Sequence, residues 1–317
     1  MKILVTGGNG YVGRELCRQL YAEHEVCVVD TLRYGTNRFS GDDLARIKLV
    51  VTDVNDAAAM ARVMNDVAPD IVIHLAAIHY IPECEGDPSL AVLTNVVGTV
   101  NTLTTCPEGC RFVYASSGAV YKPDSQPHSE TEALVGPTDV YGFSKLNGEQ
   151  YVRYFAQLRG LAAVTVRLFN VVGPGETNPH LLPEIIAQLK AGHTSISLGN
   201  LWPKRDYIHV KDAAQGFAAA ALEGSVRLGE TVTVNLGTAN SYSVAEIVRK
   251  LRRISGCAFR LRQDRSRMRA SDRPILAADN TRIQSLFGWR AKHTIDDALS
   301  DLWGEPDLAE SLMAKYR

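Results

Sequence analysis

The sequence predicts an α/β protein with a parallel sheet covered by helices on both faces. Short apolar runs alternate with helical segments through the first 170 of its 317 residues, as strands and crossover helices do in such a sheet. Three glycines stand between the first apolar run and the first helical segment. The alternation loosens after residue 170, where prolines become frequent, and this predicts a smaller second lobe.

Each element of the first part follows from its apolar pattern. Strands are expected at residues 3–6, 26–29, 48–51, 71–75, 111–115 and 163–168, and helices at 11–22, 56–67, 90–105 and 140–159. The strand segments are almost continuously apolar, which is typical of strands buried on both faces. In the second part, helices are expected near 181–191, 211–222 and 243–254, before an Arg-rich stretch at 260–274.

These patterns predict two lobes that share an interface. Residues 1–170 would form a dinucleotide-binding domain, and residues 171–317 mainly a substrate-binding α/β lobe, with parts near 205–240 returning to the first domain. No low-complexity linker separates the two parts. We therefore expect a ligand to bind between them.

The bulk composition excludes several classes of function. A net charge of −1 gives no reason to expect nucleic acid as a partner, and no apolar run approaches the roughly 18–20 residues that cross a membrane. The six cysteines form no CxxC pair and no Cys/His group with zinc spacing, so no metal site is expected. Free thiols are typical of a reducing compartment, which predicts a cytoplasmic protein.

The three glycines, Gly7, Gly10 and Gly13, have the spacing and context of a dinucleotide-binding turn. The first permits a tight turn, the second lets the backbone approach a pyrophosphate, and the third lets helix and strand pack closely. Free N–H groups at the start of the helix would then face the phosphates. We expect this turn, together with Tyr11 and Val12, to bind the cofactor.

Asp30 ends the second predicted strand, 17 residues after Gly13. A carboxylate there can accept hydrogen bonds from the adenosine ribose hydroxyls and would repel a 2′-phosphate, which predicts NAD rather than NADP. Arg33 and Arg38 lie close by and argue in the other direction. Further cofactor contacts are expected at the carboxyl ends of the third and fourth strands, from Asp53, Val54, Leu75, Ala76 and Ala77.

Tyr141 and Lys145 form the candidate reaction centre together with Ser117. The tyrosine and lysine are four residues apart on one face of a predicted helix, so the ammonium can lower the pKa of the phenol. Ser117 follows the fifth predicted strand and can hydrogen-bond the same substrate oxygen. A proton-transferring tyrosine beside a dinucleotide is typical of redox chemistry between an alcohol and a ketone.

Several motifs in order resemble those of the extended short-chain dehydrogenase/reductase family, in particular its nucleotide-sugar epimerases and dehydratases. They include the glycine turn at 6–13, His74-Leu-Ala-Ala77, Ser116-Ser-Gly-Ala-Val-Tyr121, Tyr141-Gly-Phe-Ser-Lys145, Arg167-Leu-Phe-Asn170 and Arg205-Asp-Tyr-Ile-His-Val-Lys-Asp212. The resemblance covers nearly the whole chain. It implies a doubly wound Rossmann sheet that binds NAD.

The resemblance also implies roles for individual residues. Tyr141 would be the acid/base, with Lys145 tuning its pKa and Ser117 positioning it. Asn95 and Ser116 would lie beside the cofactor, with Asn95 supporting Lys145. The substrate would meet Ser117 and Tyr141, and its other contacts would come from Asn170, Arg205, Arg269, Asp272 and His79.

One departure from the family narrows the reaction. The 4,6-dehydratases of this family carry an Asp-Glu pair just after the hydroxyl residue, where this chain has Gly118 and Ala119. The resemblance therefore implies an NAD-dependent epimerase that oxidises C4 of a UDP-hexose reversibly. The alternatives are a 4-epimerase for UDP-glucuronate or a UDP-N-acetylhexosamine, a decarboxylase, a ketosugar reductase and a non-catalytic dinucleotide-binding protein.

The resemblance further implies a homodimer. In the family, the helix with the Tyr/Lys pair and the preceding long helix meet their copies across a two-fold axis, and here these are residues 141–158 and 90–105. Apolar side chains on them are Val92, Val96, Val152, Phe155 and Ala156. The same side chains can instead face the sheet.

Overall fold

A seven-stranded parallel sheet forms the centre of the larger lobe, which confirms the predicted fold class. The computed structural model describes residues 1–33, 35, 37–176, 178–265, 268, 273–304 and 313–314. The strand order is β10-β6-β5-β4-β1-β2-β3, and every neighbouring pair is parallel. The strands are β1 (Lys2–Thr6), β2 (Glu25–Asp30), β3 (Ile47–Val51), β4 (Ile71–His74), β5 (Arg111–Ser117), β6 (Ala162–Leu168) and β10 (Thr231–Leu236).

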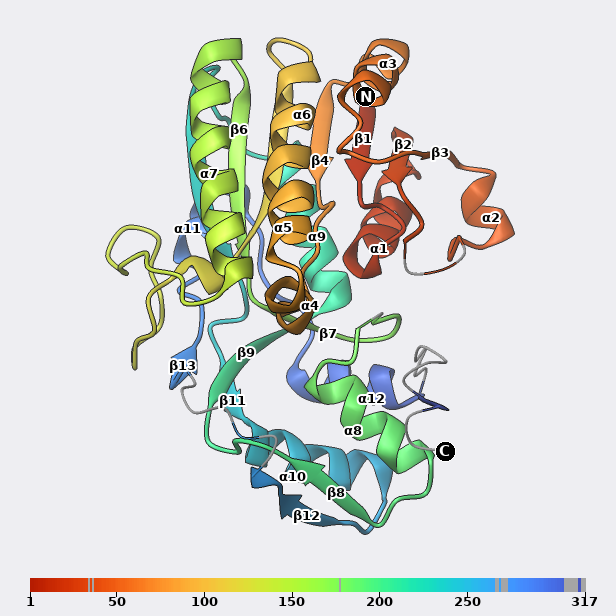
Figure 1. The fold of residues 1–317 in the computed structure, drawn as a ribbon, viewed down its shortest axis with the longest axis vertical. Coiled ribbons are helices and arrows are strands. Elements are labelled where there is room, and N and C mark those ends of the chain that lie inside the picture. The colour runs from red at the N-terminus through yellow and green to blue at the C-terminus, as the bar shows by residue number, and fades with distance from the viewer. Residues whose placement is uncertain are drawn as a thin grey trace.

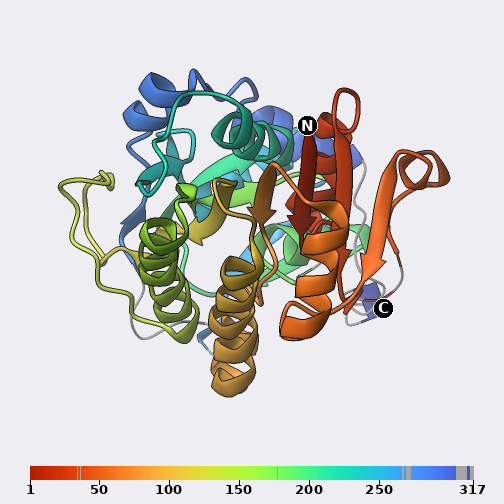
Figure 2. The same ribbon diagram turned by 90° about the horizontal axis from the view of Figure 1, so that it is seen from above.

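Helices cover both faces of this sheet (Figure 2). One layer contains α3 (Ala57–Val67), α5 (Pro88–Val92), α6 (Gly98–Thr105) and α7 (Val140–Arg159), and the other contains α1 (Tyr11–Leu20), α9 (Val210–Leu222) and α11 (Thr281–Phe287). Each layer encloses its own apolar core against the sheet. Because both faces are covered, the central strands β1, β2 and β4 are mostly apolar, whereas β10 at the edge of the sheet alternates polar and apolar residues. The short helix α2 (Gly41–Leu44) precedes β3, and α4 (Ile81–Gly86) follows β4.

The smaller lobe lies beyond the carboxyl ends of the strands (Figure 1). Strand β9 (Lys204–His209) pairs with β7 (Asn170–Val172), β11 (Ser241–Ser243) and β13 (Ile275–Leu276), while β8 (Ser195–Leu198) pairs with β12 (Arg260–Gln263). Its helices are α8 (Leu181–Lys190), α10 (Val244–Ser255) and α12 (Ile295–Gly304). They enclose a separate apolar core. The division at residue 170 stays a prediction.

The segment expected as one helix over 90–105 contains an irregular turn. It consists of α5, a π-helical turn η1 (Leu93–Val97) and α6. Such turns are rare and are frequently found at functional sites. Among the described residues, no helix has the length and apolar content that crossing a membrane requires.

Candidate active site

A cavity of about 1380 Å³ lies between the carboxyl edge of the large sheet and the smaller lobe. Its wall contains most of the residues expected from the sequence to bind cofactor or substrate: Gly7, Gly10, Tyr11, Val12, Gly13, Asp30, Asp53, Val54, Leu75, Ala76, Ala77, His79, Ser116, Ser117, Tyr141, Lys145, Asn170 and Arg205. Asn95 is buried behind this wall. Arg269 and Asp272 lie outside the described residues.

The glycine turn connects β1 to α1 at one end of the cavity. Gly7 has a φ of +71°, and a Cβ there would lie 2.6 Å from the backbone nitrogen of Ala76. A Cβ on Gly13 would lie 2.5 Å from the carbonyl oxygen of Gly7. Only glycine fits these two positions, so the turn packs directly against the end of β4 and against the start of α1. The Tyr11 hydroxyl donates to the Gly173 carbonyl (2.9 Å), which fixes the turn against the smaller lobe.

Asp30 ends β2 beside this turn. Its carboxylate accepts hydrogen bonds from the backbone N–H groups of Asn9 (3.0 Å) and Leu32 (2.8 Å). Burial raises the pKa of Asp30, and these two bonds oppose the shift. Arg33 pairs with Glu83 on α4. The anion at the end of β2 fits a ribose diol better than a phosphate.

The remaining cofactor candidates form a small-residue surface along the same edge. Ala76 and Ala77 follow β4 and are partly exposed in the cavity, as is Leu75. After β3, Val54 is buried, whereas Asp53 is exposed and accepts a hydrogen bond from the Asn55 backbone (2.9 Å). Small side chains at this edge leave room for a flat ring.

Tyr141, Lys145 and Ser117 meet at the centre of the cavity wall. Asp139 caps α7 by accepting from the Gly142 backbone N–H (2.7 Å), so the helix begins at Val140 and carries Tyr141 in its first turn. Ser117 ends β5, and its hydroxyl lies close enough to the phenol of Tyr141 to lower the pKa of that phenol. The Lys145 ammonium donates to the Ala115 carbonyl (2.7 Å). This arrangement can hold a substrate hydroxyl and exchange a proton with it.

The direction in which the Tyr141 pKa is shifted differs from the one that the sequence predicts. Burial raises the pKa of Tyr141, and the nearby Ser117 hydroxyl opposes this only in part. Burial also lowers the pKa of Lys145 to about 7. The Lys145 ammonium is directed at a carbonyl and lies 6.0 Å from the centre of the Tyr141 ring. The sequence predicted that Lys145 would stabilise the Tyr141 phenolate. In the structure, the cost of burying that phenolate is larger than this stabilisation.

Asn95 connects the helix layer to the cavity loop. Its amide donates to the Ile78 carbonyl (2.9 Å) and the Ser144 hydroxyl (2.9 Å), and its oxygen accepts from the Ile78 N–H (2.7 Å). Asn95 lies in the π-helical turn, beside the residue that precedes Lys145 on α7. It therefore positions the loop after β4 relative to α7 without lining the cavity.

A buried ion pair stands directly behind the reaction centre. Ser116 donates to the Glu149 carboxylate (2.5 Å), which also receives two hydrogen bonds from Arg167 (2.9 and 2.7 Å). The Ser116 hydroxyl is thus engaged by the core. Sequence reasoning missed Glu149, although its position eight residues after Tyr141 on one helix places it two turns further along.

On the side of the smaller lobe, polar groups converge from two strands and the segment before β13. Asn170 begins β7 and is exposed in the cavity, and Arg205 on β9 donates to the carbonyls of Lys204 and Arg273 (both 2.9 Å). The Arg273 guanidinium donates to the carbonyls of Tyr121 (2.7 Å) and Ala119 (2.9 Å). Arg273 was missed because the stretch around it shows no periodicity.

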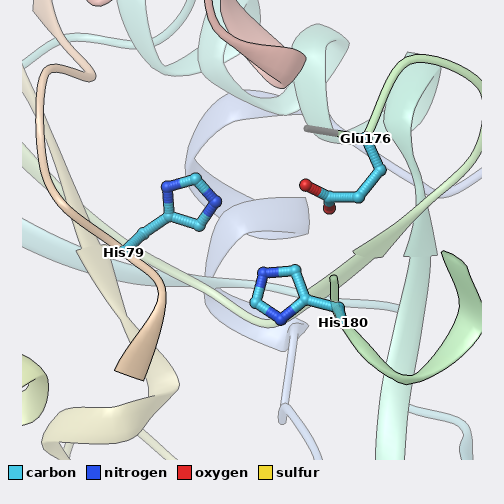
Figure 3. A group of neighbouring side chains, drawn as sticks. All are labelled: His79, Glu176 and His180. Atoms are coloured by element: carbon cyan, nitrogen blue, oxygen red, sulfur yellow. The ribbon is translucent and has the colours of Figure 1, made fainter. Parts of the chain in front are cut away.

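His79 lies on the opposite side of the same space, near Glu176 and His180 (Figure 3). Burial lowers the pKa of His79 to about 3, and His180 adds to the shift. The His79 and His180 rings are 5.8 Å apart between centres. Glu176 and His180 were not expected from the sequence, because they come from a different lobe from His79.

The sequence profile of the NAD dependent epimerase/dehydratase family matches residues 3–237. The chain belongs to this family. A UDP-glucose 4-epimerase from Corynebacterium glutamicum is 31% identical over 323 residues, covering 96% of this chain and 95% of the relative. A UDP-glucose 4-epimerase from Streptomyces lividans is 31% identical over 322 residues and covers 95% of each chain.

Solved structures of the family have the same fold. The UDP-glucose 4-epimerase of Bifidobacterium longum, in complex with NAD⁺ and UDP, superposes with a TM-score of 0.86 at 26% identity, covering 97% of this chain and 99% of that one. The enzyme of Thermotoga maritima, with UDP-glucose, gives a TM-score of 0.83 at 25% identity, covering 100% and 98%. The predicted family and the dependence on NAD are confirmed.

Proposed function

We propose that this protein is a UDP-hexose 4-epimerase that keeps NAD bound and transiently oxidises C4 of the sugar. The observation that carries the proposal is the meeting of Ser117, Tyr141 and Lys145 in the cavity that the glycine turn also lines. Relatives named UDP-glucose 4-epimerase cover nearly the full length of the chain, which supports a UDP-hexose substrate.

The residues present fit the cofactor. Gly7 and Gly13 leave no space for a side chain, and Asp30 presents a carboxylate at the end of β2. NAD held by these residues would supply the hydride acceptor and donor for C4, and its positive charge would favour the phenolate of Tyr141. We assign the ribose hydroxyls to Asp30 and the pyrophosphate to the N-terminal turn of α1.

Proton transfer falls to the residues of the reaction centre. Ser117 holds the C4 oxygen beside Tyr141, whose phenolate removes the hydroxyl proton while C4 becomes a ketone. The ketosugar rotates about its diphosphate, which stays bound. We assign Asn170 and Arg205 to hold this diphosphate. C4 then receives the hydride back on its opposite face, and Tyr141 returns the proton to the C4 oxygen. Burial of Tyr141 outweighs Lys145 in the unliganded cavity, so we assign Lys145 to stabilise the phenolate only once NAD is bound; with a pKa of about 7, Lys145 gains its charge near neutral pH.

The absence of an acidic pair after Ser117 supports epimerisation over dehydration. Gly118 and Ala119 occupy these positions, both buried, and a Cβ on Gly118 would lie 3.2 Å from the Phe169 ring. No proton donor stands there to assist the loss of water. This favours a reaction that begins and ends at C4.

The decisive experiment incubates the purified protein with a panel of UDP-sugars and no added reductant, and resolves the C4 epimers. Interconversion of UDP-glucose and UDP-galactose is expected. UDP-glucuronate and UDP-N-acetylglucosamine in the same panel test the alternative substrates. If no epimer forms while added NADH is consumed with a 4-ketosugar, the protein is a reductase.

We also propose a homodimer built on α5, η1 and α7. Exposed apolar side chains gather on these helices: Val92, Leu93, Val97, Phe143, Tyr151, Tyr154 and Leu158. This differs in detail from the expected set, because Val152 and Ala156 are buried in the core and Phe155 packs against it. Sedimentation velocity should show a dimer that Tyr154→Asp dissociates and that Leu286→Asp, an exposed position on α11 in the opposite helix layer, leaves intact.

For the cellular location we propose the cytoplasm. All six cysteines are free thiols, and five of them are buried. Thiols persist in this form in a reducing compartment. Fractionation of the source cells, with the enzyme recovered in the soluble fraction, is the expected result.

A further inference from the structure

Three side chains that are far apart in the sequence meet at the boundary of the two lobes. His79 follows β4 of the large sheet, whereas Glu176 and His180 lie in the segment between β7 and α8. One nitrogen or oxygen atom from each lies within 4.8 Å of the other two. Figure 3 shows the two imidazole rings and the carboxylate pointing toward one common space.

The contacts around the cluster orient His79 and Glu176. The Asn178 amide nitrogen lies 3.0 Å from Nε2 of His79. Because an amide nitrogen only donates, Nε2 accepts and carries a lone pair. Glu176 is 9% exposed as a residue, and one of its carboxylate oxygens accepts from the Asn178 backbone N–H (3.1 Å). His180 makes no capping hydrogen bond to α8.

We propose that His79, Glu176 and His180 form a binding site for a divalent transition-metal ion, with Zn²⁺ the best match. Two imidazoles and one carboxylate are a ligand set that binds Zn²⁺ and leaves a fourth position open. Ligand bonds of about 2.0–2.2 Å place tetrahedral ligands roughly 3.5 Å apart, so a shift of about 1 Å closes the present cluster around an ion.

The open fourth position would face the cavity. All three residues line the same space as Tyr141, so a bound ion would carry water or an oxygen of a bound anion there. The Asn178 amide competes for the lone pair of His79 and must turn away when the ion binds. Metal binding is a property of these three residues alone and does not depend on the epimerase activity.

The site is tested by titrating chelator-treated protein with Zn²⁺ in competition with a chromophoric chelator, without nucleotide sugar. One ion per chain is expected. Glu176→Gln and His180→Asn should each weaken binding by more than the roughly 10–100-fold that loss of an orienting partner costs. His193→Asn, an exposed histidine after α8, is the matched control and should bind as the unchanged protein does.

Asn178→Ala provides a second, independent measurement. It removes the competing donor, so Zn²⁺ should bind at least as tightly, and Co²⁺ in its place should show visible bands that Glu176→Gln abolishes. Thermal unfolding checks that each variant is folded. The proposal is overturned if the folded wild-type protein binds no Zn²⁺. It is also overturned if both Glu176→Gln and His180→Asn bind Zn²⁺ as tightly as His193→Asn does.

Discussion

The two sides of the cavity are built differently. On the sheet side, Ser117 and Tyr141 stand on a strand end and a helix start, and a buried ion pair of Glu149 and Arg167 supports them from behind. On the lobe side, the polar groups come from short strands and connecting segments, among them Asn170 and His180. A reaction centre needs fixed geometry, whereas a wall that receives different sugars can vary with its loops.

The largest effect is expected on the sheet side from Tyr141→Phe. Without the phenolic hydroxyl no group transfers the C4 proton, so turnover should fall by about 10²–10⁴-fold, the usual contribution of a positioned acid/base. NAD affinity should stay close to that of the unchanged protein. Steady-state rates with fluorescence titration of NAD measure both, and near-normal turnover would remove Tyr141 from the mechanism.

The support behind the centre should be the next most sensitive feature. Glu149→Gln leaves the Arg167 charge buried without its carboxylate, which should cost about 3–5 kcal/mol of unfolding free energy. The side chains of this pair are 4% and 7% exposed. Denaturant unfolding measures the loss. Glu230→Gln, which breaks an exposed pair with Arg227, is the control, and an equal loss there would contradict the argument from burial.

On the lobe side, Arg205→Gln should act on binding rather than on chemistry. A charge-assisted hydrogen bond to a diphosphate contributes about 1.5–3 kcal/mol, which corresponds to roughly a 10–150-fold rise in KM. The kcat should change little, because the interaction is the same in ground state and transition state. Arg262→Gln on the exposed strand β12 should leave both constants unaltered. A fall in kcat alone would place Arg205 in the chemical step.

The smallest effect concerns the pH dependence of stability. Burial lowers the pKa of Lys145 to about 7 in the folded protein, whereas an unfolded lysine has a pKa of about 10.4. Between these values the unfolded chain binds more protons, so this residue makes stability rise with pH. The loss of folding stability caused by burying the charged Lys145 is fully present below pH 7.

Lys145→Met removes that penalty. The NAD-free variant should be more stable than the unchanged protein at pH 6, by about 0.5–2 kcal/mol, with the advantage shrinking as the pH rises toward 10. Thermal melts across this range measure the difference. A constant difference at all pH values would show that Lys145 is not desolvated as its position implies.

Local patterns predicted the sheet side well. Helix α7 begins and ends where the sequence predicted, since Asp139 caps it and Gly160 ends it in a left-handed conformation. The glycine turn, Asp30 and the Tyr141/Lys145 pair are each encoded within a few residues. The prediction of one regular helix over 90–105 was wrong in detail. The π-helical turn holds Asn95, whose hydrogen bonds reach Ile78 and Ser144, residues that are distant in sequence and that no local pattern connects to it.

The sequence alone determined the parallel α/β fold, the dinucleotide turn and the residues that can move a proton, because each rests on neighbouring residues in one strand, turn or helix. Only the tertiary structure decided the direction of the Tyr141 and Lys145 pKa shifts, the support from Glu149, and the meeting of His79 with Glu176 and His180. Desolvation and long-range contacts arise from packing, which no local pattern records.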